Sequence, residues 1–521
     1  MRARLTRHLA SLREAPEAAR MPAVEAFPRR AAARSEAEEF NALRSAIAFR
    51  ELRGEAPAPE AMLEAAVERP TPFELPPEFT WHDYTVFLLH IGAEIEHALM
   101  VQYLYAAWSL GGPQVPERDR KRVQGWQTVI LGIAKEEMGH LITVQNLLRL
   151  IGGPLNFERE DYPFRSDFYP FNFTLERLTL DSLAKYVVAE SPEDWHGPEA
   201  DEIRKRAASS NQGDVTPVGK LYGLLIQLFE STRPAYLEER DFEARSLVYQ
   251  ASWDEWGRGY RAGARGSSGP ERHSPDLLIL PAASRDQAVA ALKAVAEQGE
   301  ALVHEADQEE SHFERFRRIY RELKAVSWEP SRPVARNPKT EQGPAPSGEA
   351  TTEAAAADSD LRCDVITDVE AIGWAHLFNL RYRLLLVDLM HALDVSGPTL
   401  QGEDLTPRGS LVNWTFGEMY NLRAIGGILV QRPLSRGGDP REQAAGPPFE
   451  MPYTLSLPHR ARDRWRLHRD LLEASGFEIK ALLGLGTAHA DYLRALAEAD
   501  HKAGQQIELL IAAPDGGRTT R

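Results

Sequence analysis

The chain has 521 residues, a hydrophobic share of 43% and a formal net charge of −16. This length allows two or more domains with sizeable cores. Nucleic-acid binding requires a basic face that neutralises phosphates, so the acidic balance argues against nucleic acid as a partner.

Cysteine content and hydropathy indicate the cellular compartment that the sequence favours. Cys363 is the single cysteine, which excludes an intrachain disulfide and thiolate-bound zinc or iron–sulfur clusters. No stretch reaches the ~18 consecutive apolar residues of a membrane span, and the N-terminus lacks the apolar segment of a secretory signal. The sequence therefore predicts a cytoplasmic protein with no membrane partner.

Helical patterns run along most of the chain, and no segment of any length alternates with the period of a strand. The predicted fold class is all-α. Composition changes divide the chain into an N-terminal helical arm (1–75), a bundle of long helices (76–327), a low-complexity linker rich in proline and alanine (328–362) and a C-terminal helical domain (363–521).

Capping and stop signals bound the individual helices. Thr80 and Asp83 form an N-terminal capping pair, which predicts a helix from about residue 82 to 110. Pro116 suits the first position of a second helix that runs to about 150. Further helices are expected over about 179–190, 217–230 and 284–326.

Two Glu-x-x-His steps have the spacing of metal clamps. Glu137 and His140 lie one helical turn apart on the same face of an apolar helix, and Glu309 and His312 repeat the step on the helix at 284–326. Left unpaired, such buried groups would be costly, and metal coordination offsets that cost. Two such helices, completed by a lone glutamate from each of two more, predict a dinuclear site inside a four-helix bundle.

The helix at 82–110 offers two glutamates for this site. Glu96 lies seven residues before Tyr103, so the two share one helix face. We favour Glu96 as the ligand and Tyr103 as a group with a proton or electron role beside the metals. Glu94 is the alternative ligand, because it forms a third Glu-x-x-His step with His97; its other interpretation is an acceptor that orients a ligand histidine.

A fourth carboxylate is needed to complete the site. Glu190, at the end of the apolar helix 179–190, is favoured, and Glu230, Glu297 and Glu300 stay open as alternatives. Hard carboxylates with one imidazole per metal suit iron or manganese. We therefore expect two iron ions, with manganese as the alternative.

The C-terminal part contains weaker versions of the same spacing. Asp388 and His391 lie one turn apart, as do Glu498 and His501, and Glu418 is a further acidic residue. No matching set of lone glutamates accompanies them. The pattern favours a helical domain that packs on the first or forms a dimer interface over a second metal bundle.

Several motifs resemble those of the iminophenylpyruvate dimer synthase family, whose best-known members work in violacein- and rebeccamycin-type pathways. The resemblance covers about residues 82–320 well and the C-terminal part loosely. It implies that residues 76–327 form a ferritin-like four-helix bundle that binds metal. The similar segments are Glu94-Ile95-Glu96-His97-Ala98, Glu136-Glu137-Met138-Gly139-His140, Ile151-Gly152-Gly153-Pro154 and Gln298-Gly299-Glu300.

The resemblance implies an O2-dependent non-haem di-iron oxidoreductase that acts on a small, amino-acid-derived imine in specialised metabolism. The expected partners are this small molecule and O2, and homo-oligomer formation is left open. Two departures bear on the substrate: members of the family are longer than this chain, and Lys220 stands where relatives often have an acidic residue. The alternatives are an iron-storage or detoxification protein and a metal-free helical scaffold.

Overall fold

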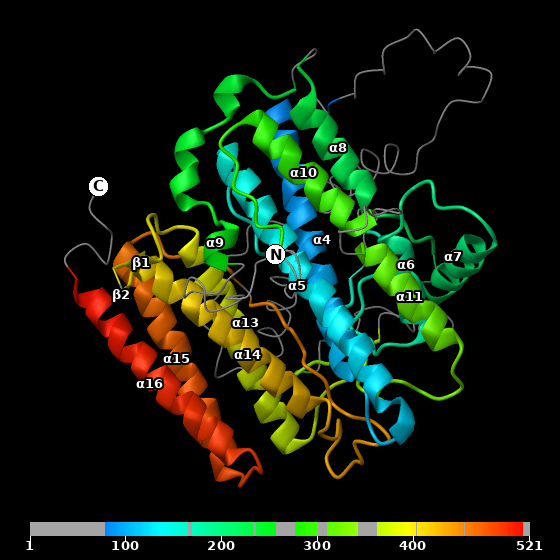
Figure 1. The fold of residues 1–521 in the computed structure, drawn as a ribbon. Helices are drawn as coiled ribbons and strands as arrows, with labels where there is room; N and C mark the ends of the chain where they lie inside the picture. Colours follow the sequence, from blue (N-terminus) through cyan, green and yellow to red (C-terminus); the bar gives the residue numbers. More distant parts are fainter. Residues whose placement is uncertain are drawn as a thin grey trace, which may run out of the picture.

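The computed structural model describes residues 75, 79–164, 169–211, 213–232, 236–256, 277–300, 310–341, 362–402, 404–452 and 454–513. Within these ranges helices dominate, and the named strands are limited to a small antiparallel hairpin of β1 (Leu400–Gln401) and β2 (Asp404–Leu405). The fold class is all-α, as the sequence predicted (Figure 1).

The first bundle is built around two long neighbouring helices, α4 (Trp81–Ser109) and α5 (Arg120–Leu150) (Figure 1). Thr80 caps α4 through a reciprocal capping box with Asp83, which confirms the predicted start. A short 3-10 turn, Glu117–Asp119, leads into α5. Most of α4 is buried, because helices cover it on several sides.

The third of the four helical positions, or members, of this bundle is occupied by two helices. α6 (Leu180–Ala189) ends where α8 (Gly219–Glu230) begins, and the Val218 N–H donates to the carbonyl of Ala189 at 2.9 Å. An insertion that contains α7 (Pro198–Asn211) separates them in sequence. The sequence predicted α6 and α8 but not α7.

The fourth member is also described as two helices, α10 (Arg285–Glu300) and α11 (His312–Lys324). α10 contacts α8 and α11 contacts α6, so the two halves run beside the two halves of the third member (Figure 1). Both lie within the single helix predicted over 284–326, and residues 301–309 between them are outside the described ranges. The ends of α6 and α11 therefore meet inside the bundle.

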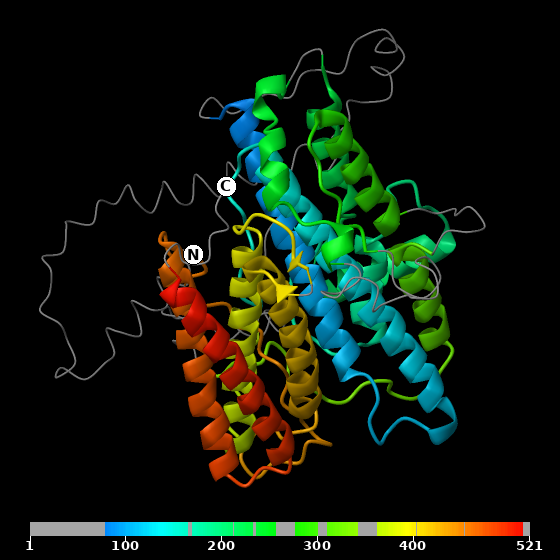
Figure 2. The ribbon, with the colours of Figure 1, turned by 60° about the vertical axis from the view of Figure 1, so that its left-hand side comes forward.

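Four further helices form a second bundle that lies beside α4 (Figure 2). Three short helical pieces also belong to the described chain. The second bundle comprises α13 (Val369–Ala392), α14 (Pro407–Leu429), α15 (Ala461–Gly484) and α16 (Ala490–Ala512), and the short pieces are Glu239–Asp241, Ala244–Tyr249 and α9 (Trp253–Trp256).

Aromatic packing joins the two bundles at the end of α4. The Trp108 ring stacks on Phe449 with centroids 5.7 Å apart and meets Phe378 edge-on at 6.2 Å. A Cβ at Gly426 on α14 would lie 2.7 Å from the Trp108 ring, so glycine is required for this close approach. The buried apolar residues of both bundles form one continuous core.

Part of the segment predicted as a linker is packed rather than free. The Arg332 N–H donates to the carbonyl of Ser109, and the Ala335 N–H donates to the carbonyl of Ala444, both at 2.8 Å. These bonds tie the segment to both bundles, which its proline-rich composition did not indicate. Residues 342–361, and the predicted arm before Leu75, lie outside the described ranges.

None of the described helices combines the length and the apolar character that crossing a bilayer requires.

Candidate metal centre

Four elements of the first bundle bring five ionisable side chains together in its interior. Glu96 comes from α4, Glu137 and His140 from α5, Glu190 directly follows α6, and His312 is the first residue of α11. All five are buried. Two groups of potential metal ligands share Glu137: one adds Glu96 and His140, the other Glu190 and His312.

The first half of the cluster is centred on His140. Its Nδ1 lies 3.1 Å from Oε2 of Glu137 and 3.4 Å from Oε2 of Glu96. Its other nitrogen, Nε2, lies 2.8 Å from Oε1 of Gln298 on α10. Nδ1 thus faces the carboxylates, while Nε2 is held by a side-chain amide.

The second half repeats this arrangement around His312. Its Nδ1 lies 2.9 Å from Oε1 of Glu137 and 3.7 Å from Oε2 of Glu190, and its Nε2 lies 2.9 Å from Oε2 of Glu136. The rings of His140 and His312 stack with centroids 5.4 Å apart. Glu137 therefore turns one oxygen to each imidazole.

A tyrosine hydroxyl holds each outer carboxylate. Tyr103 donates to Oε1 of Glu190 at 2.5 Å, and Tyr222 on α8 donates to Oε1 of Glu96 through a short hydrogen bond. In each carboxylate the tyrosine takes one oxygen and the other oxygen, Oε2, faces a histidine. The cluster is approximately two-fold symmetric about Glu137.

Three buried atoms at the centre make ion-pair contacts but no well-aligned hydrogen bond among the described residues. They are Oε2 of Glu96, Oε1 of Glu137 and Nδ1 of His312, the last two being 2.9 Å apart. Buried polar atoms are normally satisfied, and these atoms converge on shared space. Carboxylate oxygens with imidazole nitrogens are the ligands that iron and manganese accept. Imidazoles whose second nitrogen is held by a neighbouring side chain are also typical of metal ligands. The residues therefore fit a pair of such cations.

Burial and the charges of neighbouring groups shift the pKa values of the clustered side chains. Burial, together with the charge of Glu137, raises the pKa of Glu96 to about 8 and also raises that of Glu190. Although burial opposes it, contact with Glu137 and Glu96 raises the pKa of His140 to about 10. Glu137 has the same effect on His312. Protons thus supply positive charge that metal ions would replace on binding.

The space beside the cluster is small. A cavity of about 20 Å³ touches Glu96, Glu137, His140 and Glu190 and is closed by α8 and α10. This is room for a water-sized molecule. Gly299 borders it, and a Cβ there would lie 3.5 Å from Oε2 of Glu190.

The structure distinguishes between the glutamates that were candidates for the fourth carboxylate. Glu190 joins the cluster, whereas Glu230 pairs with Lys293 at 3.0 Å on the surface and Glu297 is exposed. Glu309 and the side chain of Glu300 lie outside the described residues. Of the predicted Glu309/His312 clamp, His312 lies in the cluster, whereas Glu309 as a ligand stays a prediction.

The third Glu-x-x-His step does not contribute to the cluster. Glu94 accepts a hydrogen bond from the Tyr169 hydroxyl at 2.5 Å. His97 lies 2.6 Å from the hydroxyl of Tyr382 on α13. This step therefore supports the packing around α4.

Sequence reasoning missed the side chains that support the cluster. Glu136 lies next to Glu137 in the recognised motif, so its contact with His312 had a local signal that was not used. Gln298 also lies in a recognised segment, Gln298-Gly299-Glu300, but its contact with His140 depends on how α10 packs, and the contact of Tyr222 with Glu96 depends on how α8 packs. Arg315 contacts Glu136 one turn into α11 and was likewise not singled out.

The second bundle brings different groups together. His468 Nδ1 lies 3.0 Å from Oδ1 of Asp388, and His391 Nδ1 lies 3.0 Å from Nε2 of His468. Glu418 pairs with Arg381. Among the described residues of this bundle, no group of three ligand atoms lies close enough together to hold a metal ion.

Comparison with known proteins defines the class of the first bundle. Residues 89–321 match the family model described as Ferritin-like. This stretch runs from α4 to α11 and contains all five clustered side chains. The chain therefore carries a ferritin-like domain, as the resemblance implied.

Two curated relatives extend the similarity. Dichlorochromopyrrolate synthase of Lentzea aerocolonigenes is 27% identical over 409 residues, which cover 70% of this chain and 35% of the relative. The 2-imino-3-(indol-3-yl)propanoate dimerase of Chromobacterium violaceum is 27% identical over 291 residues, which cover 49% of this chain and 25% of the relative. These matches confirm the resemblance to imine-dimerising enzymes. This chain spans about a third and a quarter of their respective lengths.

A solved structure of a ferritin-like protein from Caulobacter vibrioides covers 66% of this chain and 93% of its own, with 16% identity and a TM-score of 0.33. Similarity at this level carries no argument about function.

Proposed function

We propose that the clustered residues hold two iron ions, with manganese as the alternative, and that the protein is an O2-dependent oxidase or oxygenase. Two groups of residues that share Glu137 would hold the metals, one with Glu96 and His140 and the other with Glu190 and His312; Glu309 is the expected further ligand. The observation that carries this proposal is the position of Glu137, whose two oxygens face two different imidazoles.

When bound, iron would supply the reduction of O2 and the oxidation of the substrate. The chain's own residues then have defined tasks. Tyr103 and Tyr222 donate hydrogen bonds to the outer carboxylates, Glu190 and Glu96. Their hydroxyl groups are the ones we propose for proton exchange at the site. Gln298 and Glu136 fix the tautomers and ring orientations of the two histidines. Burial of the whole cluster excludes bulk water.

The substrate class rests on the relatives. One is named as a dimerase of 2-imino-3-(indol-3-yl)propanoate and the other as dichlorochromopyrrolate synthase. Their names support a small, amino-acid-derived imine as the substrate of this protein. Because the chain spans only part of their lengths, the activity is a proposal for the ferritin-like domain.

Metal analysis of the purified protein tests the centre directly. Anaerobic loading with Fe(II), followed by elemental analysis, should give about two irons per chain, and exposure to O2 should change the absorbance of the loaded protein. Less than half an equivalent of any transition metal after reconstitution would favour the metal-free scaffold and overturn the proposal. Many irons per chain would instead indicate storage or detoxification.

Matched variants test the ligand assignment. Glu137→Ala should abolish metal binding, because both metal positions lose a ligand. Glu96→Gln should weaken binding at one position. Glu94→Gln, on the same helix but outside the cluster, should leave the metal content unchanged. Unaltered metal content in Glu137→Ala would show that the site is misplaced.

A further inference from the structure

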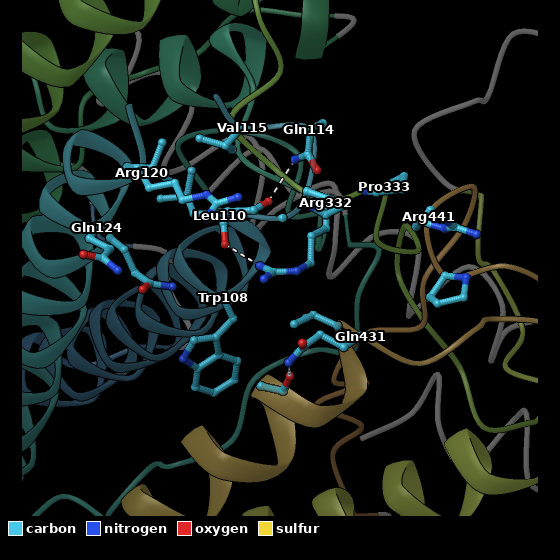
Figure 3. A pocket seen from close by; sticks show the side chains of 18 of the residues that line it. Trp108, Leu110, Gln114, Val115, Arg120, Gln124, Arg332, Pro333, Gln431 and Arg441 are labelled. Atoms are coloured by element: carbon cyan, nitrogen blue, oxygen red, sulfur yellow. Dashed lines mark hydrogen bonds between the residues drawn. The ribbon is translucent and has the colours of Figure 1, made fainter. Parts of the chain in front are cut away.

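A cavity lined by residues of both bundles lies away from the ionisable cluster. Its volume is about 780 Å³, within the usual range of small-molecule sites. Its walls come from the end of α4, the start of α5, the segment around residue 332 and the end of α14 (Figure 3). Trp108 in its wall lies twelve residues beyond Glu96 on α4, or ~18 Å along the helix axis.

The lining of this cavity is positively charged, although the chain as a whole is acidic. It contains four arginines, Arg120, Arg332, Arg423 and Arg441, and no aspartate or glutamate. Arg441 pairs with Asp439 at 2.7 Å. Among the described residues, the other three arginines form no ion pair with a carboxylate. Positive charge concentrated in a concave, partly closed space attracts anions.

Arg332 is held in place by its backbone and by its own side chain. Its N–H donates to the Ser109 carbonyl at 2.8 Å, and its Nη1 donates to the Leu110 carbonyl at 2.5 Å, the bond drawn in Figure 3. A Cβ at Gly112, whose φ is 118°, would lie 2.4 Å from Oε1 of Gln114 and 3.1 Å from Cγ of Arg332, so the loop passes close to both side chains. Burial lowers the pKa of this guanidinium, because no carboxylate compensates for lost solvent. The loop is thus shaped around a fixed cation.

An aromatic ring lines the same cavity. Trp108 is only 6% exposed, and its Nε1 has no hydrogen-bond acceptor among the described residues. The stack on Phe449 fixes the indole plane. Val123, Leu131 and Val430 add apolar surface.

We propose that this cavity binds an organic anion in which a planar aromatic body carries a carboxylate or phosphate group. The anionic group would accept hydrogen bonds from Arg332, with Arg120 and Arg423 adding charge. The aromatic body would lie against the apolar wall that includes Trp108. This second site does not depend on the metal centre.

Calorimetric titration of the full chain tests the proposal with matched probes. Indole-3-acetate carries an aromatic ring and a carboxylate, ATP carries a ring and phosphates, and tryptamine carries the same ring as the first probe with a positive charge. We expect at least one of the two anions to bind, and tryptamine to bind more weakly than indole-3-acetate. Preference for ATP would identify phosphate, and preference for indole-3-acetate would identify carboxylate. Absence of binding by both anions at millimolar concentration would overturn the proposal.

Three variants locate the binding. Arg332→Gln and Arg423→Gln should each raise the dissociation constant of the bound anion by about tenfold, the effect of losing a charged hydrogen bond. Arg423 is exposed on α14, so its replacement keeps the test valid should Arg332→Gln fail to fold. Arg118→Gln removes the same charge from an 86% exposed side chain outside the lining and should have no effect. Equal affinity in wild type, Arg332→Gln and Arg423→Gln would place the anion elsewhere and overturn the proposal.

Discussion

The hydroxyl of Tyr103 donates to Oε1 of Glu190 at 2.5 Å, inside the first bundle. Burial, reinforced by the charge of Glu190, raises the pKa of Tyr103 well above its usual range. The phenol therefore stays protonated and acts as a fixed donor. Its bond leaves Oε2 of Glu190 directed towards His312, so the tyrosine determines which carboxylate oxygen is available at the centre of the cluster.

Replacement of Tyr103 by phenylalanine should weaken metal binding without unfolding the bundle. Glu190 would lose the donor that orients it, and loss of such a supporting bond costs about 10–100-fold in metal affinity. Titration of the apo-protein with Fe(II) under anaerobic conditions measures this change.

Tyr186→Phe is the matched control for that experiment. Tyr186 packs edge-on against Tyr103 with centroids 4.9 Å apart, and its hydroxyl makes no hydrogen bond among the described residues. Its metal affinity should equal that of the wild type. Equal affinities in all three proteins would contradict the role assigned to Tyr103.

Loss of Arg315 should destabilise the fold itself. Arg315 contacts the fully buried carboxylate of Glu136, with its Nη1 at 3.1 Å from Oε1. Arg315→Met would leave that carboxylate short of a charge partner, which costs about 3–5 kcal/mol for a buried pair. Urea denaturation of the metal-free protein measures the free energy of unfolding.

A surface pair on the same helix provides the comparison. Arg318 lies 2.9 Å from Glu310, and both side chains are about half exposed. Arg318→Met should change the free energy of unfolding by less than about 1 kcal/mol. If Arg315→Met and Arg318→Met lowered the free energy of unfolding by similar amounts, burial of Glu136 would not explain the cost of losing Arg315.

The sequence was sufficient to predict features that depend on neighbouring residues. Thr80 caps α4 where the capping pattern indicated, and α6 begins next to the residue at which the predicted helix 179–190 starts. Glu137 and His140 share a face because one helical turn separates them, and the structure brings them together. These predictions needed no knowledge of how the helices pack.

Other features depend on contacts between distant segments and could not be predicted in this way. Tyr222 reaches Glu96 across 126 positions in the chain, and the break between α6 and α8 puts it there. Arg332 lines a cavity only because its segment pairs with the end of α4. Helical periodicity describes one face of one element, whereas these positions follow from the assembled bundle.

Glu199 should make the stability of the insertion pH-dependent. Its carboxylate joins α7 to α11 through Arg321 at 2.5 Å and Arg317 at 2.9 Å, and these bonds lower its pKa to about 2. A folded pKa below the unfolded value gives stability that is present above about pH 4.5 and lost as the pH falls towards 2. Glu199→Gln should therefore be less stable than wild type at neutral pH, and the difference should vanish in acid.

Urea midpoints of the two proteins, measured at neutral and at acidic pH, check this expectation. Glu193→Gln makes the same charge change, with the nearest cation, Lys220, 4.0 Å away and the carboxylate largely exposed. Its midpoint should match the wild type at both pH values. A Glu199→Gln difference that persists unchanged in acid would show that packing, not charge, couples α7 to α11.

The last prediction concerns a buried arginine in the second bundle. Arg381 on α13 donates from Nε to Glu418 at 2.6 Å and from Nη1 to Asp500 at 2.8 Å, which ties α13 to α14 and α16. Arg381→Met would leave the buried carboxylate of Glu418 and the partly buried one of Asp500 without their cation, and should cost about 3–5 kcal/mol of unfolding free energy. Arg494→Met, which removes an exposed pair with Asp491, should cost less than about 1 kcal/mol. Combining Arg381→Met with Glu418→Gln and Asp500→Asn should recover part of the loss, because no uncompensated charge is left; a triple variant no more stable than Arg381→Met would assign the cost to lost packing instead.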